Sequence, residues 1–162
     1  MKIRKAGKKN MEGLWEIEIE NRKYHKKITN KKYNLFNKNK IDKKSKEEYL
    51  NNLKKDIKNQ KIITLVAIEN EKVVGTISAY FSKWKWSDNP PKYIQINDLG
   101  VLIKYKQKGI ATKLIKEVEK IARSQKIKFI YLGVWANNNS SIKFYQKNKY
   151  EKYRLEMIKK IG

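Results

Sequence analysis

Hydrophobic residues recur along the chain with two different spacings, and each spacing predicts its own kind of element. Apolar residues three and four positions apart indicate amphipathic helices, whereas runs rich in Ile, Val, Thr and Tyr indicate strands. The helices are expected over 10–25, 46–58, 109–125 and 138–147. The strands are expected over 2–6, 62–68, 73–80, 93–103, 129–134 and 150–161. Residues 26–44 are polar, lack a clear period and are expected to form a loop.

The order of these elements predicts one α/β domain that spans residues 1–162. The crossover through helix 109–125 should make the strands before and after it parallel neighbours. The turn between strands 62–68 and 73–80 should instead close an antiparallel hairpin. We therefore expect a mixed, mostly antiparallel sheet flanked by helices. A chain of 162 residues can bury a useful core, and no repeat or domain boundary is evident.

Two local signals concern the helices on the N-terminal side. Ser45 and Glu48 have the spacing of a capping box, so the second helix should begin near residue 46. Glu18 interrupts the apolar stripe of helix 10–25. It either pairs with Arg22, four residues further on, or faces an acceptor pocket and holds a cationic amine.

The loop between strand 93–103 and helix 109–125 carries charge of a single sign. Lysines 104, 106, 108 and 113 surround it, with no acidic residue among them. A helix that begins at such a loop presents unpaired N–H groups and the positive end of its dipole, which favours phosphate. Gly109 has no side chain to hold a phosphate away from the backbone. The stretch thus predicts a site for a phosphate-bearing ligand, the alternative being an ordinary basic turn.

Composition narrows the chemistry further. The chain has no cysteine and one histidine, His25, which excludes a disulfide framework, a thiolate zinc site and a cysteine nucleophile. We expect no metal and a solvent-exposed His25. No apolar run approaches the length of a membrane span, and no signal-peptide pattern opens the chain. A cytoplasmic protein with no membrane association is expected.

The net charge of +24, from forty Lys and Arg against sixteen Asp and Glu, has two interpretations. It reflects either a compositional bias of the source genome or attraction to phosphates, nucleic acid or acidic surfaces. The basic residues are spread through the chain without an isolated block, and no nucleic-acid-binding motif is found. A basic nucleic-acid-binding protein is therefore the alternative class and is not favoured.

Two motifs give the phosphate site an identity. The run Lys106-Gln107-Lys108-Gly109-Ile110-Ala111 resembles the acetyl-CoA loop of the GNAT N-acetyltransferase superfamily, with Lys106 in place of the usual Gln or Arg. The run from Asn138 through Tyr145 to Tyr150 resembles the Asn-x-x-Ala-x-x-x-Tyr-x-x-x-Gly-Phe run of the same family. There Ser141 replaces Ala, Lys149 replaces Gly and Tyr150 replaces Phe. The resemblance spans the whole chain and implies a GNAT-like acyl-CoA N-acyltransferase fold.

The resemblance also implies roles for residues. Backbone N–H groups of the loop residues Gln107, Lys108, Gly109, Ile110, Ala111 and Thr112 would bind the pyrophosphate of acetyl-CoA, and Lys106 is a further candidate for cofactor binding. The preceding strand would meet the pantetheine arm through Leu99, Gly100 and Val101, and Asn138 would bond the same arm. Glycine inside a strand often marks a bulge, so Gly100 is expected to splay this strand from its neighbour and open the cofactor slot. Tyr145 would donate a proton to the leaving sulfur.

The base and the acceptor are less defined. Asp98 is the best-placed acid to take a proton from the amine, with a purely structural role as its alternative. The branch of the family that acetylates ribosomal protein N-termini commonly has Leu-Glu-Val-Arg here, whereas this chain has Leu132-Gly133-Val134-Trp135. We expect a small primary amine as acceptor, with peptide or protein amines as the alternative. Glu18, Trp84 and Trp86 are candidates for the acceptor pocket, and the tryptophans could equally cover a hydrophobic edge. The acyl group and the oligomeric state, including a homodimer, stay open.

Overall fold

Five strands form one sheet in the computed structural model, which describes residues 1–28, 40–85, 88–159 and 161. They lie side by side in chain order: β1 (Lys2–Lys5), β2 (Ile62–Glu69), β3 (Lys72–Lys83), β4 (Lys92–Val101) and β5 (Phe129–Leu132). Neighbouring strands are antiparallel except β4 and β5, which are parallel. The mixed, mostly antiparallel sheet expected from the sequence is confirmed.

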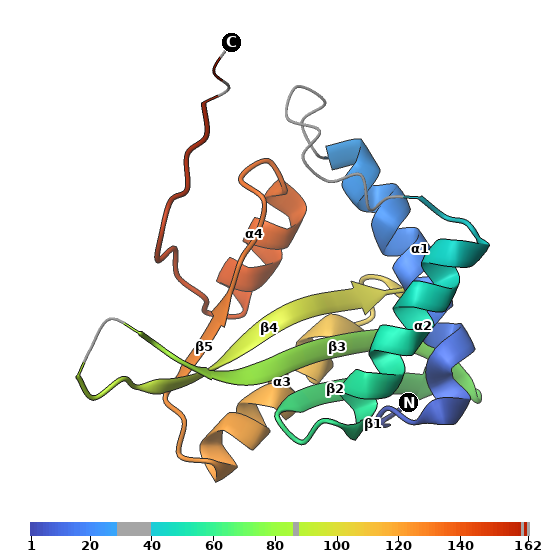
Figure 1. The fold of residues 1–162 in the computed structure, drawn as a ribbon, viewed down its shortest axis with the longest axis horizontal. Coiled ribbons are helices and arrows are strands. Elements are labelled where there is room, and N and C mark those ends of the chain that lie inside the picture. Colours follow the sequence, from blue (N-terminus) through green and yellow to red (C-terminus); the bar gives the residue numbers. More distant parts are fainter. Residues whose placement is uncertain (29–39, 86–87, 160, 162) are drawn as a thin grey trace.

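Helices cover both faces of this sheet, as Figure 1 shows. Their bounds are α1 (Met11–Ile28), α2 (Lys43–Lys58), α3 (Ile110–Ser124) and α4 (Asn139–Lys147). Helices α1 and α2 pack on one face, where Leu14, Ile17 and Leu53 meet Val66 of β2. Helix α3 packs on the other face, where Leu114 and Val118 are fully buried against the strands. The period-two pattern of β2 separates the two cores, since Leu65 and Ala67 belong to the α3 side.

The predicted helices exist, but two boundaries differ from the sequence expectation. Helix α1 continues to Ile28, three residues past the expected end. Helix α2 begins at Lys43 because Asp42 is its N-cap and accepts a hydrogen bond from the Ser45 N–H at 2.8 Å. Ser45 Oγ in turn accepts from the Asp42 N–H at 3.1 Å. The capping box predicted from Ser45 to Glu48 is therefore wrong, because Asp42 offers a reciprocal cap one helical turn earlier.

The expected final strand over 150–161 does not form in its described part, residues 150–159 and 161. Apolar residues of this segment are exposed, among them Leu155, Met157 and Ile161. Alternating apolar residues predict a strand only if an edge is there to pair with them. Strand β5, the sheet edge nearest this tail, has only four residues, and Figure 1 shows the tail running away from the sheet.

The irregularity in β4 lies at Asn97, so the predicted bulge at Gly100 is wrong. Ser78 of β3 pairs with Asp98 and Ala79 with Ile96, which leaves Asn97 as the extra residue. Gly100 pairs in register with Thr76. A glycine is needed at position 100 for a different reason. An added Cβ would lie 2.5 Å from Ile17 Cγ2 and 2.8 Å from Asn21 Nδ2. Helix α1 therefore packs directly on the backbone of β4.

No helix within the described ranges is long and apolar enough to cross a membrane.

Candidate active site

A cavity of about 660 Å³ lies where the pairing of β4 with β5 ends. The register of the two strands ends with the pair Ile96 and Leu132, directly before the bulge at Asn97. Within the described ranges, the rest of β4 has no strand partner on that side, and the start of α3 and one side of α4 complete the wall. The bulge thus opens the slot that the sequence analysis expected, three residues earlier than expected.

Most of the residues predicted for the site line this cavity. They are Asp98, Leu99, Val101, Lys106, Gln107, Gly109, Ile110, Ala111, Thr112, Asn138 and Tyr145. Gly100 and Lys108 are not part of the lining. Gly100 lies under α1, and the Lys108 ammonium lies 5.0 Å from the ring centroid of Tyr105.

The loop between β4 and α3 forms a cradle of backbone donors. Gln107 and Gly109 both have positive φ, 63° and 74°, and α3 begins at the next residue, Ile110. The first turn of α3 has no acidic residue and no side-chain cap, so its N–H groups have no partner within the helix, and its residues Ile110, Ala111 and Thr112 line the cavity. An added Cβ at Gly109 would meet no atom within 4 Å. The open space, the free N–H groups and the helix dipole suit an anionic group.

Asn138 is buried and its side chain is held from two directions. Its Oδ1 accepts hydrogen bonds from the Ser141 N–H at 3.1 Å and from Tyr24 Oη at 2.9 Å. Because a backbone N–H can only donate, the atom facing Ser141 must be the amide oxygen. With both lone pairs of that oxygen engaged, the Nδ2 group is the part of the side chain left to donate toward a ligand.

Tyr145 reaches the cavity from α4, between two other aromatic rings. Its ring centroid lies 5.2 Å from that of Phe144 and 5.6 Å from that of Tyr150. Burial, and secondarily the nearby Asp98 carboxylate, raises the pKa of Tyr145 to about 12. The phenol is therefore protonated at neutral pH and can donate a proton.

Asp98 follows the bulge and is the one acidic residue among the described residues that line this cavity. Burial raises the pKa of its carboxyl to about 6, helped by the negative charge of Glu18 and opposed by a hydrogen bond from the Leu99 N–H. The Asn21 side chain donates to Asp98 Oδ1 at 3.3 Å. A carboxylate with a pKa near the working pH can take up and release a proton, which suits a general base.

A second cavity, of about 520 Å³, lies on the other side of Asn97 and Asp98, and these two residues line both cavities. Helices α1 and α2 and the sheet surround it. Glu18 lines this second cavity and also pairs with Arg22, whose Nε lies 2.6 Å from Glu18 Oε1. The two alternatives posed for Glu18 are therefore not exclusive: the ion pair is confirmed, and the residue does line a cavity.

Two tryptophans, Trp84 and Trp86, were candidates for the acceptor pocket. Trp84 lines neither cavity. Its ring centroid lies 4.6 Å from that of Tyr93 with the two rings tilted, and it contacts Phe129 edge-on at 5.7 Å. These contacts with the ends of β4 and β5 favour the second of the two interpretations of Trp84, in which it covers a hydrophobic edge. Trp86 lies outside the described residues.

Several lining residues come from α1, and the sequence analysis assigned none of them to this site. Asn21, Tyr24 and His25 line the first cavity, although the sequence predicted a solvent-exposed His25. His25 is half-buried, and burial lowers its pKa, with Glu18 opposing the shift. Asn21 and Tyr24 follow the apolar stripe of α1 at helical spacing, the one signal that could have identified them. Trp135 also lines this cavity.

Comparisons with known proteins agree with this architecture. The model of the acetyltransferase (GNAT) family matches residues 29–150. An uncharacterized N-acetyltransferase of Bacillus subtilis, YycN, is 29% identical over 82 residues, which are 48% of this chain and 53% of that protein. The chain thus matches about half the length of this curated relative.

Solved structures share the fold at low sequence identity. A mutant of the BH1408 protein from Bacillus halodurans superposes with a TM-score of 0.84 at 16% identity, over 100% of both chains. The aminoglycoside 6'-N-acetyltransferase AAC(6')-Ig from Acinetobacter haemolyticus gives a TM-score of 0.68 at 15% identity, also over 100% of both chains. Because the family model covers most of its length, the chain belongs to the acetyltransferase (GNAT) family.

Proposed function

We propose that this chain transfers an acetyl group from acetyl-CoA directly to a small primary amine. The observation that carries the proposal is one cavity with an anion cradle at the loop before α3 and with Asp98, Asn138 and Tyr145 around the same space. The family supports it, and so does a structural neighbour, AAC(6')-Iy, which was solved in complex with CoA. An aminoglycoside acetyltransferase among the neighbours supports a small amine as acceptor rather than a protein.

The cradle fits the diphosphate of CoA in charge and in room. The backbone N–H groups from Gln107 to Thr112 would bind its oxygens, and Gly109 leaves the space that a side chain would fill. Lys106 adds a positive charge from the rim. The backbone of Leu99 and Val101 would hold the pantetheine arm, and Asn138 Nδ2 would bond one of its amide carbonyl groups.

The thioester supplies an activated acetyl carbon and a sulfur leaving group. Asp98 would take the proton that an ammonium must lose before its nitrogen can attack. Tyr145, protonated because burial raises its pKa to about 12, would give a proton to the departing sulfur. Both groups work without a covalent enzyme intermediate.

Thermal unfolding with acetyl-CoA, CoA and ATP in parallel tests the donor site. A ligand at 100 times its dissociation constant should add about 2.7 kcal/mol to the free energy of unfolding. We expect acetyl-CoA and CoA to raise the melting temperature and ATP to leave it nearly unchanged. If neither form of CoA shifts the transition of cooperatively folded protein, the proposed donor site is wrong.

A further inference from the structure

The second cavity is acidic in a strongly basic chain. Five carboxylates and three cationic side chains line it, whereas the chain as a whole has sixteen Asp and Glu against forty Lys and Arg. The carboxylates are those of Glu18, Asp42, Glu48, Asp56 and Asp98. The first cavity has the opposite balance, with Asp98 against Lys106 and Lys147. An acidic lining is therefore not a by-product of composition.

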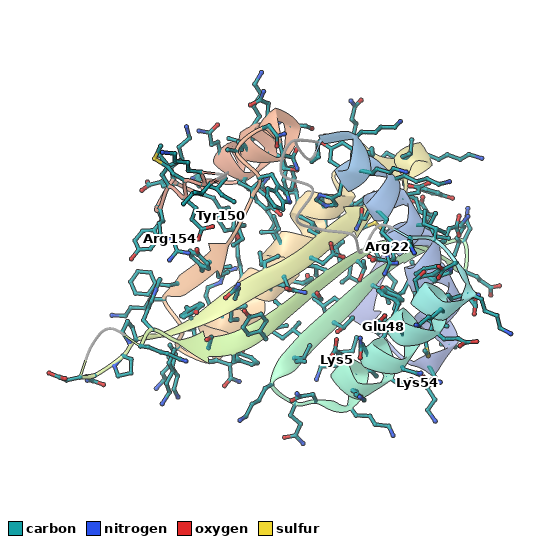
Figure 2. The ribbon with its side chains drawn as sticks, turned by 45° about the horizontal axis from the view of Figure 1, so that its top comes forward. Lys5, Arg22, Glu48, Lys54, Tyr150 and Arg154 are labelled. Carbon is teal, nitrogen blue, oxygen red and sulfur yellow. The ribbon has the colours of Figure 1, made fainter. Side chains whose placement is uncertain are left out.

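Part of this negative charge is already neutralised from within. Glu18 pairs with Arg22, and Asp42, which accepts from the Ser45 N–H, also lies near the positive charges of Lys40 and Lys44. Figure 2 labels Arg22 on α1 and Glu48 on α2, the two helices that cover this face of the sheet. The unneutralised charge lies on α2 and at Asp98.

Helix α2 presents a polar stripe to the cavity. Glu48, Asn52 and Asp56 follow one another at four-residue spacing, which puts them on one face over about 12 Å of helix. Within the described ranges, neither Glu48 nor Asp56 forms an ion pair or a side-chain hydrogen bond. Burial raises the pKa of Asp56, with no cation beside it to offset the cost. In a chain with forty Lys and Arg, these two carboxylates are left for an external cation.

The floor of the cavity holds a second, independent sign of a ligand. Thr64, on β2, is 8% exposed and lines the cavity. Its hydroxyl has no hydrogen-bond partner among the described residues, whereas Thr76 Oγ1 donates to the Leu65 carbonyl at 3.0 Å. Thr64 Oγ1 is not among the fully buried polar atoms, so it opens into the cavity, where a polar group of a bound molecule can be its partner.

The position of the cavity connects it to the reaction centre. Asn97 and Asp98 line both cavities, so a molecule in the second cavity reaches the same carboxyl that faces the first. A positively charged acceptor on this side and an anionic donor on the other would each meet a lining of opposite charge.

We propose that the second cavity is the acceptor site and that it takes a linear di- or polyamine. The inference rests on the proposed acetyl transfer. One amino nitrogen lies at Asp98, while the other ammonium groups pair with Glu48 and Asp56 and one hydrogen-bonds Thr64. In the transfer, a C–N bond forms as the C–S bond breaks. The amine proton goes to Asp98 and the thiolate receives one from Tyr145, which gives an N-acetylpolyamine and CoA.

Steady-state release of CoA with three amines tests the acceptor class. Spermidine and butane-1,4-diamine carry two or more amino groups, whereas butylamine has a single one on the same four-carbon chain. We expect kcat/KM for spermidine to exceed that for butylamine by about a hundredfold, because each charge-assisted contact contributes about tenfold. Equal values for the two amines overturn the inference.

Variants that remove the carboxylate charges of α2 test whether Glu48 and Asp56 contact the amine. The double variant Glu48→Gln and Asp56→Asn should raise KM for spermidine about tenfold or more while KM for acetyl-CoA stays unchanged. The matched control is Glu47→Gln with Glu151→Gln, which removes the same charge from exposed positions outside both cavities. If the two double variants behave alike, long-range charge explains the effect and the site is misplaced.

Thr64→Val separates a ligand contact from a structural one. A hydroxyl kept for a ligand should leave the protein at least as stable when it is removed, while KM for spermidine rises several-fold. Loss of stability with unchanged KM contradicts the proposal.

If acetyl-CoA stabilises the protein but no polyamine is acetylated, only the acceptor inference fails. If acetyl-CoA does not bind, the proposed function fails with it.

Discussion

Tyr24 and Asn138, which are 114 positions apart in sequence, share a hydrogen bond of 2.9 Å from the Tyr24 hydroxyl to Asn138 Oδ1. It joins the C-terminal half of α1 to the residue that caps α4. Asn138 Oδ1 also accepts from the Ser141 N–H, so its amide is fixed with the Nδ2 group free to donate. One tyrosine of the first helix therefore orients the residue that is proposed to hold the pantetheine arm.

The variant Tyr24→Phe tests this orientation. Loss of one hydrogen bond, worth about 1 kcal/mol, should weaken acetyl-CoA binding by about two- to tenfold and leave kcat nearly unchanged. Calorimetric titration with CoA measures the effect. Tyr153→Phe, an exposed position outside the cavity, serves as the control. Unchanged affinity in Tyr24→Phe would mean that Ser141 alone fixes the amide.

The phenol of Tyr145 should matter for turnover and not for binding. Tyr145→Phe is expected to lower kcat by about a hundredfold, the usual contribution of a positioned acid, with CoA affinity retained. Tyr150→Phe is a matched control, because the neighbouring Tyr150 hydroxyl is buried without a partner within the described ranges. Figure 2 labels Tyr150, which follows α4 in the chain. Equal kcat values in both variants would remove Tyr145 from the proton transfer.

Gly109 should be intolerant of any side chain for two separable reasons. Its φ of 74° strains a β-branched residue, and a side chain would fill the space of the cradle. Gly109→Val is expected to lose both stability and CoA affinity. Gly109→Asn, which adopts positive φ more easily, should keep its melting temperature and still lose CoA affinity about tenfold or more. An Asn variant that binds CoA normally would contradict the placement of the phosphates.

Protonation of Asp98 should lower the activity at acidic pH. Because burial raises the pKa of its carboxyl to about 6, kcat/KM should fall as the pH falls through 6, and Asp98→Asn should abolish this limb along with most turnover. The same shift has the opposite sign for stability. A carboxyl with a raised folded-state pKa binds its proton more tightly in the folded protein, so its contribution to the free energy of unfolding increases as the pH falls from 6 toward 4.

As the pH falls from 6 toward 4, kcat/KM should therefore decrease while the contribution of Asp98 to stability increases. A pH profile of kcat/KM beside one of the melting temperature makes the comparison. If activity drops only where the protein melts, Asp98 is not the base.

Gly100 should be required for packing rather than for a bulge. Gly100→Ala would place Cβ 2.5 Å from Ile17 Cγ2, so the free energy of unfolding should fall by about 1–3 kcal/mol. Gly133→Ala is the control, since a Cβ there meets no atom within 4 Å. Denaturant unfolding compares the two. Equal stability would show that α1 shifts away from β4 at little cost.

The sequence alone predicted the elements whose signals are local. The apolar stripe of α3, the hairpin of β2 and β3, and the loop before Ile110 all follow from residue spacing over short distances, and all form as expected. The parallel pairing of β4 and β5 followed from the crossover rule. The candidate residues near that loop, with Asn138 and Tyr145, could be named because two short motifs carry them.

Only the tertiary structure decided the features that depend on distant partners. The bulge at Asn97, the close packing of α1 on Gly100 and the failure of the tail to pair all depend on elements far away in sequence. The acidic cavity also depends on distant elements, since Glu48 and Asp56 on α2 line one cavity with Thr64 and Asp98 only once the sheet is folded. Local spacing fixes which face a side chain takes on its own helix or strand. Packing between distant elements decides what that face contacts, and this packing forms both the slot beside β4 and the acidic cavity.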